Sequence, residues 1–266
     1  MLGVEVRNVE MKITAADDMI ISAAGASGSD PQQCRLPTSM KLVKEIKIDY
    51  PRRVCHYKGY TYVTSGLRDL AQSIDRLDGH GDIAKGFMNF ELFVVGFIAH
   101  DDRLYTALRK LNQTNVAVYE LSGKKVLSWR HSDEDIFSFI VSCKALTVFR
   151  DQLVTADVNK FTLYALTGEC LRVVDCNKIG ATKVSLCHAG GDSIIVTNGD
   201  ALPAMLKFNL ATAAVEWTSN VVKEPSAVTM LNKEYALVTE YQSSDHVKLF
   251  IINQITGEKR FPRLLL

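Results

Sequence analysis

A six-bladed β-propeller, an all-β fold built from four-stranded antiparallel blades, is predicted by three observations. One signature, a polar turn followed by a short apolar run and a hydroxyl residue, returns six times along the 266 residues at a spacing of about 42. Each unit contains enough alternating apolar segments for four short strands. No long amphipathic segment of helical period interrupts the units. The repeat therefore suits a propeller blade better than a solenoid or a βαβ unit.

The hydroxyl residue of the signature sets the register of the repeat. Successive hydroxyl residues are 42, 42, 49, 42 and 42 residues apart, and the additional seven residues fall between Trp129 and Leu146. A β-sandwich with hairpins that look alike by chance is the alternative, but chance does not hold one register through six units. The hydroxyl residues are Ser22, Thr64, Thr106, Thr155, Thr197 and Thr239.

Each unit is predicted to have one strand before the hydroxyl residue, one through it, and two more beyond it. The third strands include VAVYELSG at 116–123 and FTLYALTG at 161–168, which have the β-branched and aromatic alternation of strands. Six units occupy nearly all of residues 1–266, so we expect one domain. Its first strand is predicted at about 4–13 and its last outer strand at about 257–265.

The overall composition gives no sign of a nucleic-acid or membrane protein. Lys and Arg total 31 against 30 Asp and Glu, so no global field of one sign is present. Charges at Glu5, Arg7 and Glu10 interrupt any signal-peptide core, and no apolar stretch is long enough to span a bilayer. The six cysteines include no CxxC pair, which favours reduced thiols. We expect a soluble, cytoplasmic, monomeric protein without a cofactor.

Two of the units resemble NHL repeats. Residues 50–65, YPRRVCHYKGYTYVTS, have the proline, apolar strand, turn and Tyr-Val-Thr run of that repeat, and residues 152–171 follow it through Asp157 and Asn159. The resemblance extends over nearly all of the chain at the level of the fold. It departs from the family where Lys160 follows the asparagine in place of arginine. The resemblance implies a face that binds RNA or protein, as in the NHL propellers of tripartite-motif proteins.

Loops between the second and third strands, and between blades, share one face of a propeller and are the predicted binding region. Cationic residues in these loops would form an arc that could hold a phosphodiester backbone or an acidic peptide. The other interpretation of the same charges is a set of solvated loops. We expect a non-catalytic binding scaffold with a protein or RNA partner. The predicted ligand-binding residues are Arg52, Arg53, Arg68, Arg109, Lys110, Asn112, Lys160 and Tyr241.

A Ca²⁺-dependent lactonase of the gluconolactonase type is the alternative function. Its oxygen ligands would be Asp157, Asn198 and Glu240, which closely follow the repeat hydroxyl. Only three of the six units supply such a group, and Asp157 is one position out of phase with the others. His56 and His188 occupy strand positions where half-buried, hydrogen-bonded histidines are expected. The sequence has no GxSxG, HExxH or P-loop motif, so we expect binding rather than catalysis.

Overall fold

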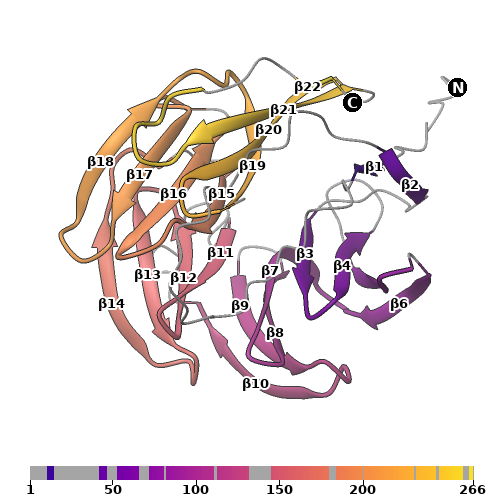
Figure 1. The fold of residues 1–266 in the computed structure, drawn as a ribbon. Helices are drawn as coiled ribbons and strands as arrows, with labels where there is room; N and C mark the ends of the chain where they lie inside the picture. The colour runs from indigo at the N-terminus through magenta and orange to yellow at the C-terminus, as the bar shows by residue number, and fades with distance from the viewer. Residues whose placement is uncertain are drawn as a thin grey trace, which may run out of the picture.

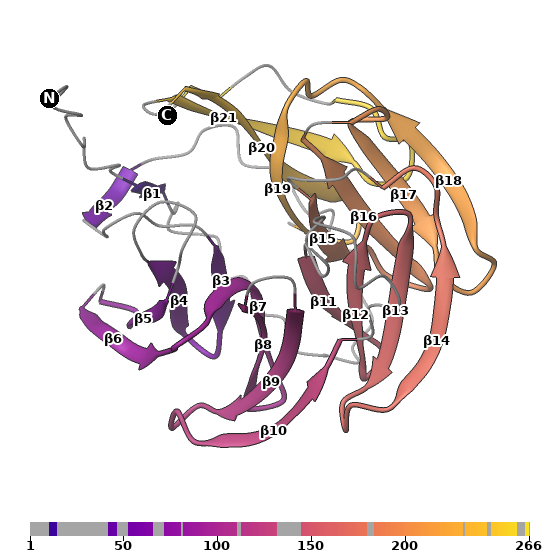
Figure 2. The same cartoon turned by 180° about the vertical axis from the view of Figure 1, so that it is seen from behind.

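The computed structural model confirms a β-propeller of four-stranded antiparallel blades. Five such sheets are arranged around a common axis (Figures 1 and 2). None of the described residues forms a helix long and apolar enough to cross a membrane. The structure describes residues 11–14, 42–46, 53–65, 72–80, 82–110, 113–131, 145–179, 184–199, 201–230, 232–243, 246–259 and 264–265.

Each blade is a meander whose first strand lies nearest the axis and whose fourth lies at the rim (Figure 1). First strands of successive blades contact one another, β3 with β7, β7 with β11, β11 with β15 and β15 with β19. The strands are β3 (Val54–Tyr57), β4 (Tyr60–Ser65), β5 (Ser73–Leu77) and β6 (Ile83–Asn89); β7 (Phe93–His100), β8 (Arg103–Lys110), β9 (Gln113–Glu120) and β10 (Lys125–Arg130); β11 (Ala145–Phe149), β12 (Gln152–Asp157), β13 (Lys160–Ala165) and β14 (Cys170–Asp175); β15 (Val184–His188), β16 (Ser193–Asn198), β17 (Met205–Asn209) and β18 (Ala214–Ser219); and β19 (Pro225–Met230), β20 (Tyr235–Ser243), β21 (His246–Asn253) and β22 (Leu264–Leu265).

The predicted count of six four-stranded blades is wrong for the described residues, which form five. β1 (Met11–Thr14) instead pairs antiparallel with β2 (Leu42–Ile46), with Met11 opposite Ile46. Residues 42–46 lie about twenty residues beyond Ser22, where the repeat predicts the fourth strand of the unit whose first strand is predicted at about 4–13. First and fourth strands are not neighbours in a meander. This two-stranded sheet lies between the β19–β22 and β3–β6 blades (Figures 1 and 2). Ser22, the predicted first hydroxyl, lies outside the described residues.

The repeat hydroxyl is confirmed as a position of the second strand in the five blades. Thr64, Thr106, Thr155 and Thr197 are fully buried in β4, β8, β12 and β16, and Thr239 is half-buried in β20. Most buried hydroxyls in proteins have hydrogen-bond partners, and Thr64 and Thr106 follow this pattern. The backbone N–H of Arg53 donates to Thr64 Oγ1 at 2.9 Å, and Thr106 Oγ1 donates to the Ala117 carbonyl at 2.9 Å.

The predicted insertion is confirmed as a longer connection between blades. β10 ends at Arg130 and β11 begins at Ala145, whereas only residues 90–92 separate β6 from β7. Within the predicted last outer strand at about 257–265, the described residues Leu264–Leu265 form β22, and Lys259 forms an isolated bridge with Ile252.

Two tryptophans on outer strands pack against glycines in turns of the following blade. A Cβ atom at Gly168 would lie 2.7 Å from Trp129 Cε3, and one at Gly257 would lie 2.9 Å from Trp217 Cε3. Both glycines have positive φ, +95° and +73°, which side chains rarely adopt. Glycine is thus required at both turns. We name the packing of Trp129 on Gly168 and of Trp217 on Gly257 the Trp–Gly contacts.

The four described cysteines, Cys55, Cys170, Cys176 and Cys187, are free thiols. Burial raises the pKa of Cys187 to about 12 and also raises the pKa values of the Cys55 and Cys176 thiols. These three side chains are protonated near neutral pH and are poor nucleophiles.

Candidate functional site

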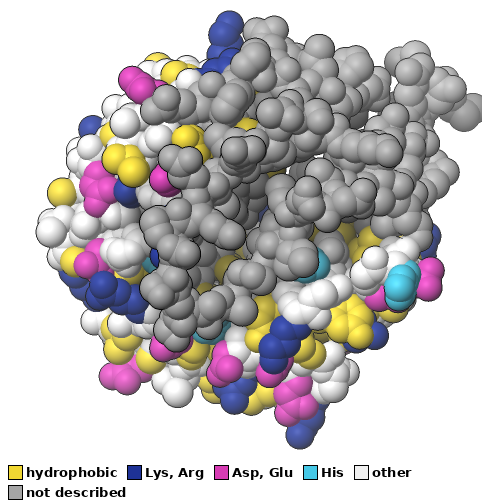
Figure 3. Space-filling model, in the orientation of Figure 1, with side chains coloured by type: hydrophobic (Ala, Val, Ile, Leu, Met, Phe, Trp, Pro, Cys, Tyr) yellow, Lys and Arg dark blue, Asp and Glu magenta, His cyan; other side chains and the backbone are white. Residues whose placement is uncertain are grey.

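The ends of the blades form two faces of the ring. On the loop face, second strands continue into third strands and each blade connects to the next. On the turn face, hairpin turns join the first strand to the second and the third to the fourth. Charged side chains of both signs are interspersed over the described surface in Figure 3. Neither sign dominates the surface seen there.

Three of the predicted ligand-binding residues are described with their side chains, and all three belong to the loop face. Arg53 directly precedes β3, Arg109 lies near the end of β8 and Lys160 begins β13, and each is half-buried. The strand order thus puts them on one face in three successive blades. Outside the described residues are Arg52, Arg68 and Asn112, together with the side chains of Lys110 on β8 and Tyr241 on β20.

Arg53 reaches across the axis of the ring. Its guanidinium donates a hydrogen bond of 3.4 Å to the backbone carbonyl of Val184, the first residue of β15. The two residues belong to blades separated on one side by the β7–β10 and β11–β14 blades. A cation predicted to bind a ligand is therefore already part of a contact between two blades that are not neighbours.

Exposed apolar side chains are a feature of the loop face that the sequence did not predict. Leu202, between β16 and β17, is 80% exposed, and Val221, between β18 and β19, is 44% exposed. The N–H of Ala204 donates to Asn220 Oδ1 at 2.8 Å and joins these two loops. The sequence signal for this feature is the Ala-Leu-Pro run at 201–203, an apolar segment within a loop.

Two of the suggested calcium ligands form hydrogen bonds with backbone groups instead. Asn198 Nδ2 donates at 2.8 Å to the carbonyl of Lys178, and Glu240 Oε2 accepts from the N–H of Lys223 at 3.1 Å. Lys178 and Lys223 lie in the connections that enter the β15–β18 and β19–β22 blades. Both side chains therefore fix the start of their own blade.

The third suggested ligand, Asp157, belongs to a buried hydrogen-bonded set. Asp157 Oδ2 lies 2.6 Å from His131 Nε2, and the Tyr164 hydroxyl lies 2.8 Å from His131 Nδ1. His131 is fully buried and follows β10, so the set joins two neighbouring blades. Sequence reasoning missed it, since its members are far apart in the chain. Among the described residues, no group of three or more His, Cys, Asp or Glu side chains is placed to hold a metal ion.

The two histidines assigned to strands differ in their surroundings. His188 is half-buried as predicted, and its ring packs edge-on against Phe149 with centroids 5.2 Å apart. His56 is exposed, so the prediction of a half-buried position is wrong there. β3 alternates exposed and half-buried residues, and His56 falls on its exposed side.

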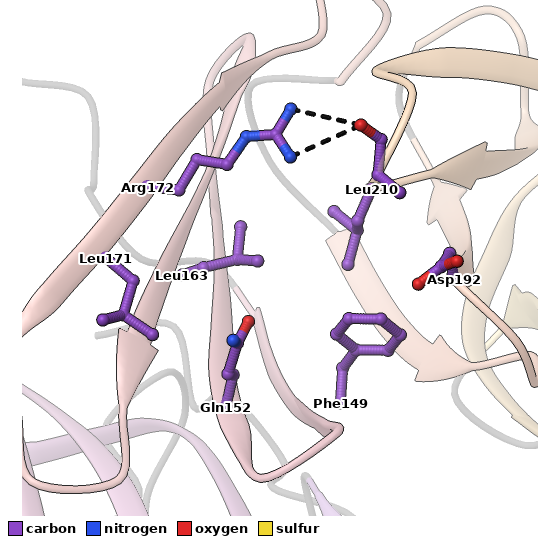
Figure 4. Close-up of a pocket in the computed structure, with 8 residues that line it drawn as sticks. Phe149, Gln152, Leu163, Leu171, Arg172, Asp192 and Leu210 are labelled. Atoms are coloured by element: carbon purple, nitrogen blue, oxygen red, sulfur yellow. Dashed lines mark hydrogen bonds between the residues drawn. The ribbon is translucent and has the colours of Figure 1, made fainter.

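A pocket of about 310 Å³ opens on the turn face between the β11–β14 and β15–β18 blades (Figure 4). The residues that line it come from hairpin turns and strand ends of both blades, so no single sequence motif indicates the pocket. Apolar side chains and three polar ones surround the space. The lining residues are Phe149, Gln152, Leu163, Leu171, Arg172, Asp192, Leu210 and Ala211.

These features define a β-propeller with a candidate binding surface on each face. The fold is similar to solved structures of low sequence identity. A protein of unknown function from Bacteroides caccae is 11% identical with a TM-score of 0.63, covering 85% of this chain and 86% of that one. A chain of the nidogen/laminin complex is 13% identical with a TM-score of 0.65 and the same coverage, 85% and 86%. A chain of the mitotic checkpoint complex is 12% identical with a TM-score of 0.56, covering 78% and 63%.

No protein-family model and no curated protein matches the chain. These three structures are each less than 25% identical to this chain and support the propeller fold alone.

Proposed function

We propose that this protein, taken as a single propeller domain over residues 1–266, is a non-catalytic scaffold that binds a segment of another protein on its loop face. The observation that carries the proposal is the pair of exposed apolar side chains, Leu202 and Val221, on two joined loops. Exposed apolar surface with polar surroundings is typical of protein-binding sites. The cations of the same face, Arg53, Arg109 and Lys160, favour a partner segment with acidic residues beside apolar ones.

A protein partner suits this face better than RNA. Single-stranded RNA is held by aromatic side chains that stack on bases and by cations that contact phosphates. The exposed large apolar side chains of the described loop face are Val54, Leu202 and Val221, which are aliphatic. Aliphatic side chains contribute to protein interfaces but offer no stacking surface.

The similar structures and the repeats are consistent with this proposal. Two of the similar chains come from structures of a nidogen/laminin complex and a mitotic checkpoint complex. The likeness of the repeats to NHL repeats favours the same face. A fold alone does not define a function, so the loop residues carry the test.

Affinity capture from cell extract with substituted proteins tests the proposal. Leu202→Glu and Arg53→Glu should each reduce the amount of captured partner by about tenfold or more, since a buried apolar contact or charge pair is lost. Ile255→Glu is the control for Leu202→Glu, because Ile255 is also an exposed aliphatic residue but follows β21 on the turn face. Capture unchanged by both loop-face substitutions would contradict the proposal, and capture abolished by ribonuclease would indicate RNA.

A further inference from the structure

We propose that the pocket between the β11–β14 and β15–β18 blades is a second binding site, for an extended peptide that carries an aliphatic side chain close to a carboxylate. The site lies on the turn face and is separate from the loop-face surface. The blade interface, the pocket lining, the charge of Arg172 and the edge strand β14 support this site.

The pocket lies at a blade interface that has no Trp–Gly contact. The interfaces before and after it are each covered by a tryptophan on an outer strand that packs on a turn glycine of the next blade. Here the outer strand β14 reads CLRVVD, without an aromatic residue. The facing turn has Ala213, at a φ of +55°, where glycine would be expected. The apolar wall between the two blades is therefore left uncovered.

The inner part of the pocket is apolar. Phe149, Leu163 and Leu210 are each at least nine-tenths buried and line the space from both blades. A volume of about 310 Å³ is at the small end of ligand pockets, and it suits one or two aliphatic side chains. Burial of such a side chain against these residues would provide the apolar part of the binding energy.

Arg172 supplies the charge that selects a carboxylate. The other arginine near the pocket, Arg150, is paired with Asp192 at 2.9 Å. Arg172 instead donates from both terminal nitrogens to the carbonyl of Ala211, at 3.5 Å each (Figure 4). These bonds are at the upper limit of hydrogen-bond length, and a carboxylate would accept two shorter, charge-assisted bonds from the same guanidinium. Arg172 is exposed and so is accessible to such a ligand.

The edge of β14 favours a peptide over a small molecule. β14 is the last strand of its sheet, and Leu171 and Val173 on it are 46% and 50% exposed. Leu171 lies at a β-bulge, because Leu163 pairs with Arg172 and Tyr164 pairs with Cys170. An extended peptide can pair with a free strand edge while it inserts a side chain into an adjacent pocket. A small molecule in the pocket would leave Val173 uncovered.

Fluorescence anisotropy with synthetic peptides tests the site on the full chain. The probes are a set of fluorescein-labelled octapeptides of Ser and Gly. Each carries one Leu and one Asp, which are one, two or three residues apart in the different peptides. Matched peptides replace Leu with Ala or Asp with Asn. At least one Leu/Asp peptide should bind, and each matched peptide should bind about tenfold more weakly, which is the ordinary cost of one lost anchor.

Substitution of Arg172 tests whether its guanidinium binds the carboxylate of the peptide. Arg172→Gln should weaken binding of the Leu/Asp peptide about tenfold. It should also remove the preference for Asp over Asn, since the charged donor is lost. Arg130→Gln is the matched control, because Arg130 is an exposed arginine on the outer strand of the neighbouring blade. A second variant, Ala211→Phe, should block the pocket without altering Arg172. The melting temperature of each variant verifies that it is folded.

Three results would overturn the inference. The first is the absence of binding by any Leu/Asp peptide with a Kd below about 1 mM, which is the weak limit of specific recognition. The second is equal binding by wild type, Arg172→Gln and Ala211→Phe. The third is binding of 4-methylpentanoate as tight as that of the best peptide, which would indicate a small-molecule pocket. Leu202→Glu should leave peptide binding unchanged, so failure of the loop-face proposal is distinguishable from failure here.

Discussion

Arg53 and Val184 are 131 residues apart in the chain, and the guanidinium of the first donates to the carbonyl of the second across the axis of the ring. Most contacts in a repeat architecture join neighbouring units. This contact instead joins the β3–β6 blade to the β15–β18 blade. At 3.4 Å it is a long hydrogen bond from a half-buried side chain, so it adds little to the stability of the fold.

Arg53→Gln should therefore separate binding from stability. We expect the free energy of unfolding to fall by about 1 kcal/mol or less, the usual net value of one hydrogen bond. Capture of a protein partner should nevertheless decrease, because the loop face loses a cation. Urea denaturation and quantitative capture provide the two measurements. A loss of stability above about 3 kcal/mol would instead assign Arg53 a structural role.

His131→Ala should destabilise the protein by about 3 kcal/mol, because it removes a buried partner of Asp157 and Tyr164. Tyr164→Phe should cost about 1–2 kcal/mol, since it removes one hydrogen bond. His56→Ala is the control, because His56 is exposed and its replacement should change stability by less than about 0.5 kcal/mol. Equal unfolding midpoints for the His131 and His56 variants would contradict the importance of this buried set.

Gly168→Ala should be more destabilising than Gly59→Ala. Both glycines have positive φ, +95° and +78°, so both substitutions strain the backbone by about 1 kcal/mol. Only at Gly168 would the new Cβ also overlap Trp129, at a further cost of about 1–3 kcal/mol; nothing lies within 4 Å at Gly59. Thermal unfolding of the two variants provides the comparison. A Gly59 variant as unstable as the Gly168 variant would show that the tryptophan contact is unimportant.

Cys170 should react with a thiol reagent much faster than Cys187. Cys170 is exposed on β14, whereas burial raises the pKa of Cys187 to about 12 and keeps it protonated at neutral pH. Mass spectrometry after timed N-ethylmaleimide treatment locates each modified cysteine. Modification of Cys187 should require unfolding by urea, and rapid modification in the native protein would contradict its burial.

Glu216 should make stability depend on pH in the acidic range. Burial raises its pKa, but hydrogen bonds from Ser193, Asn209 and Lys207 outweigh this and lower the pKa below the usual 4.5. A lowered pKa stabilises the fold above about pH 4.5, and this contribution is lost as the pH falls through the lower folded value. Glu216→Gln should therefore melt below wild type at pH 7, with a difference that shrinks toward pH 3. A constant difference would contradict this assignment.

The sequence predicted the parts of the fold that are set within one unit. Thr106 and Thr155 identify second strands because a buried hydroxyl between apolar residues is a local pattern. The pairing of Met11 with Ile46 was not predictable in this way, since it depends on which distant strand is available. His131 bonds to Asp157 in the next blade, and the pocket at Arg172 is formed by turns of two blades. Contacts between units leave no periodic signal in the sequence.

Hydrogen exchange of the protein in complex with its captured partner tests the central claim, binding on the loop face, most directly. Binding at Leu202 and Val221 should slow amide exchange in residues 201–204 and 220–224. Exchange in the turn-face segments 165–168 and 253–257 should be the same with and without the partner. Protection confined to the turn face, or no change in residues 201–204 and 220–224, would contradict the account.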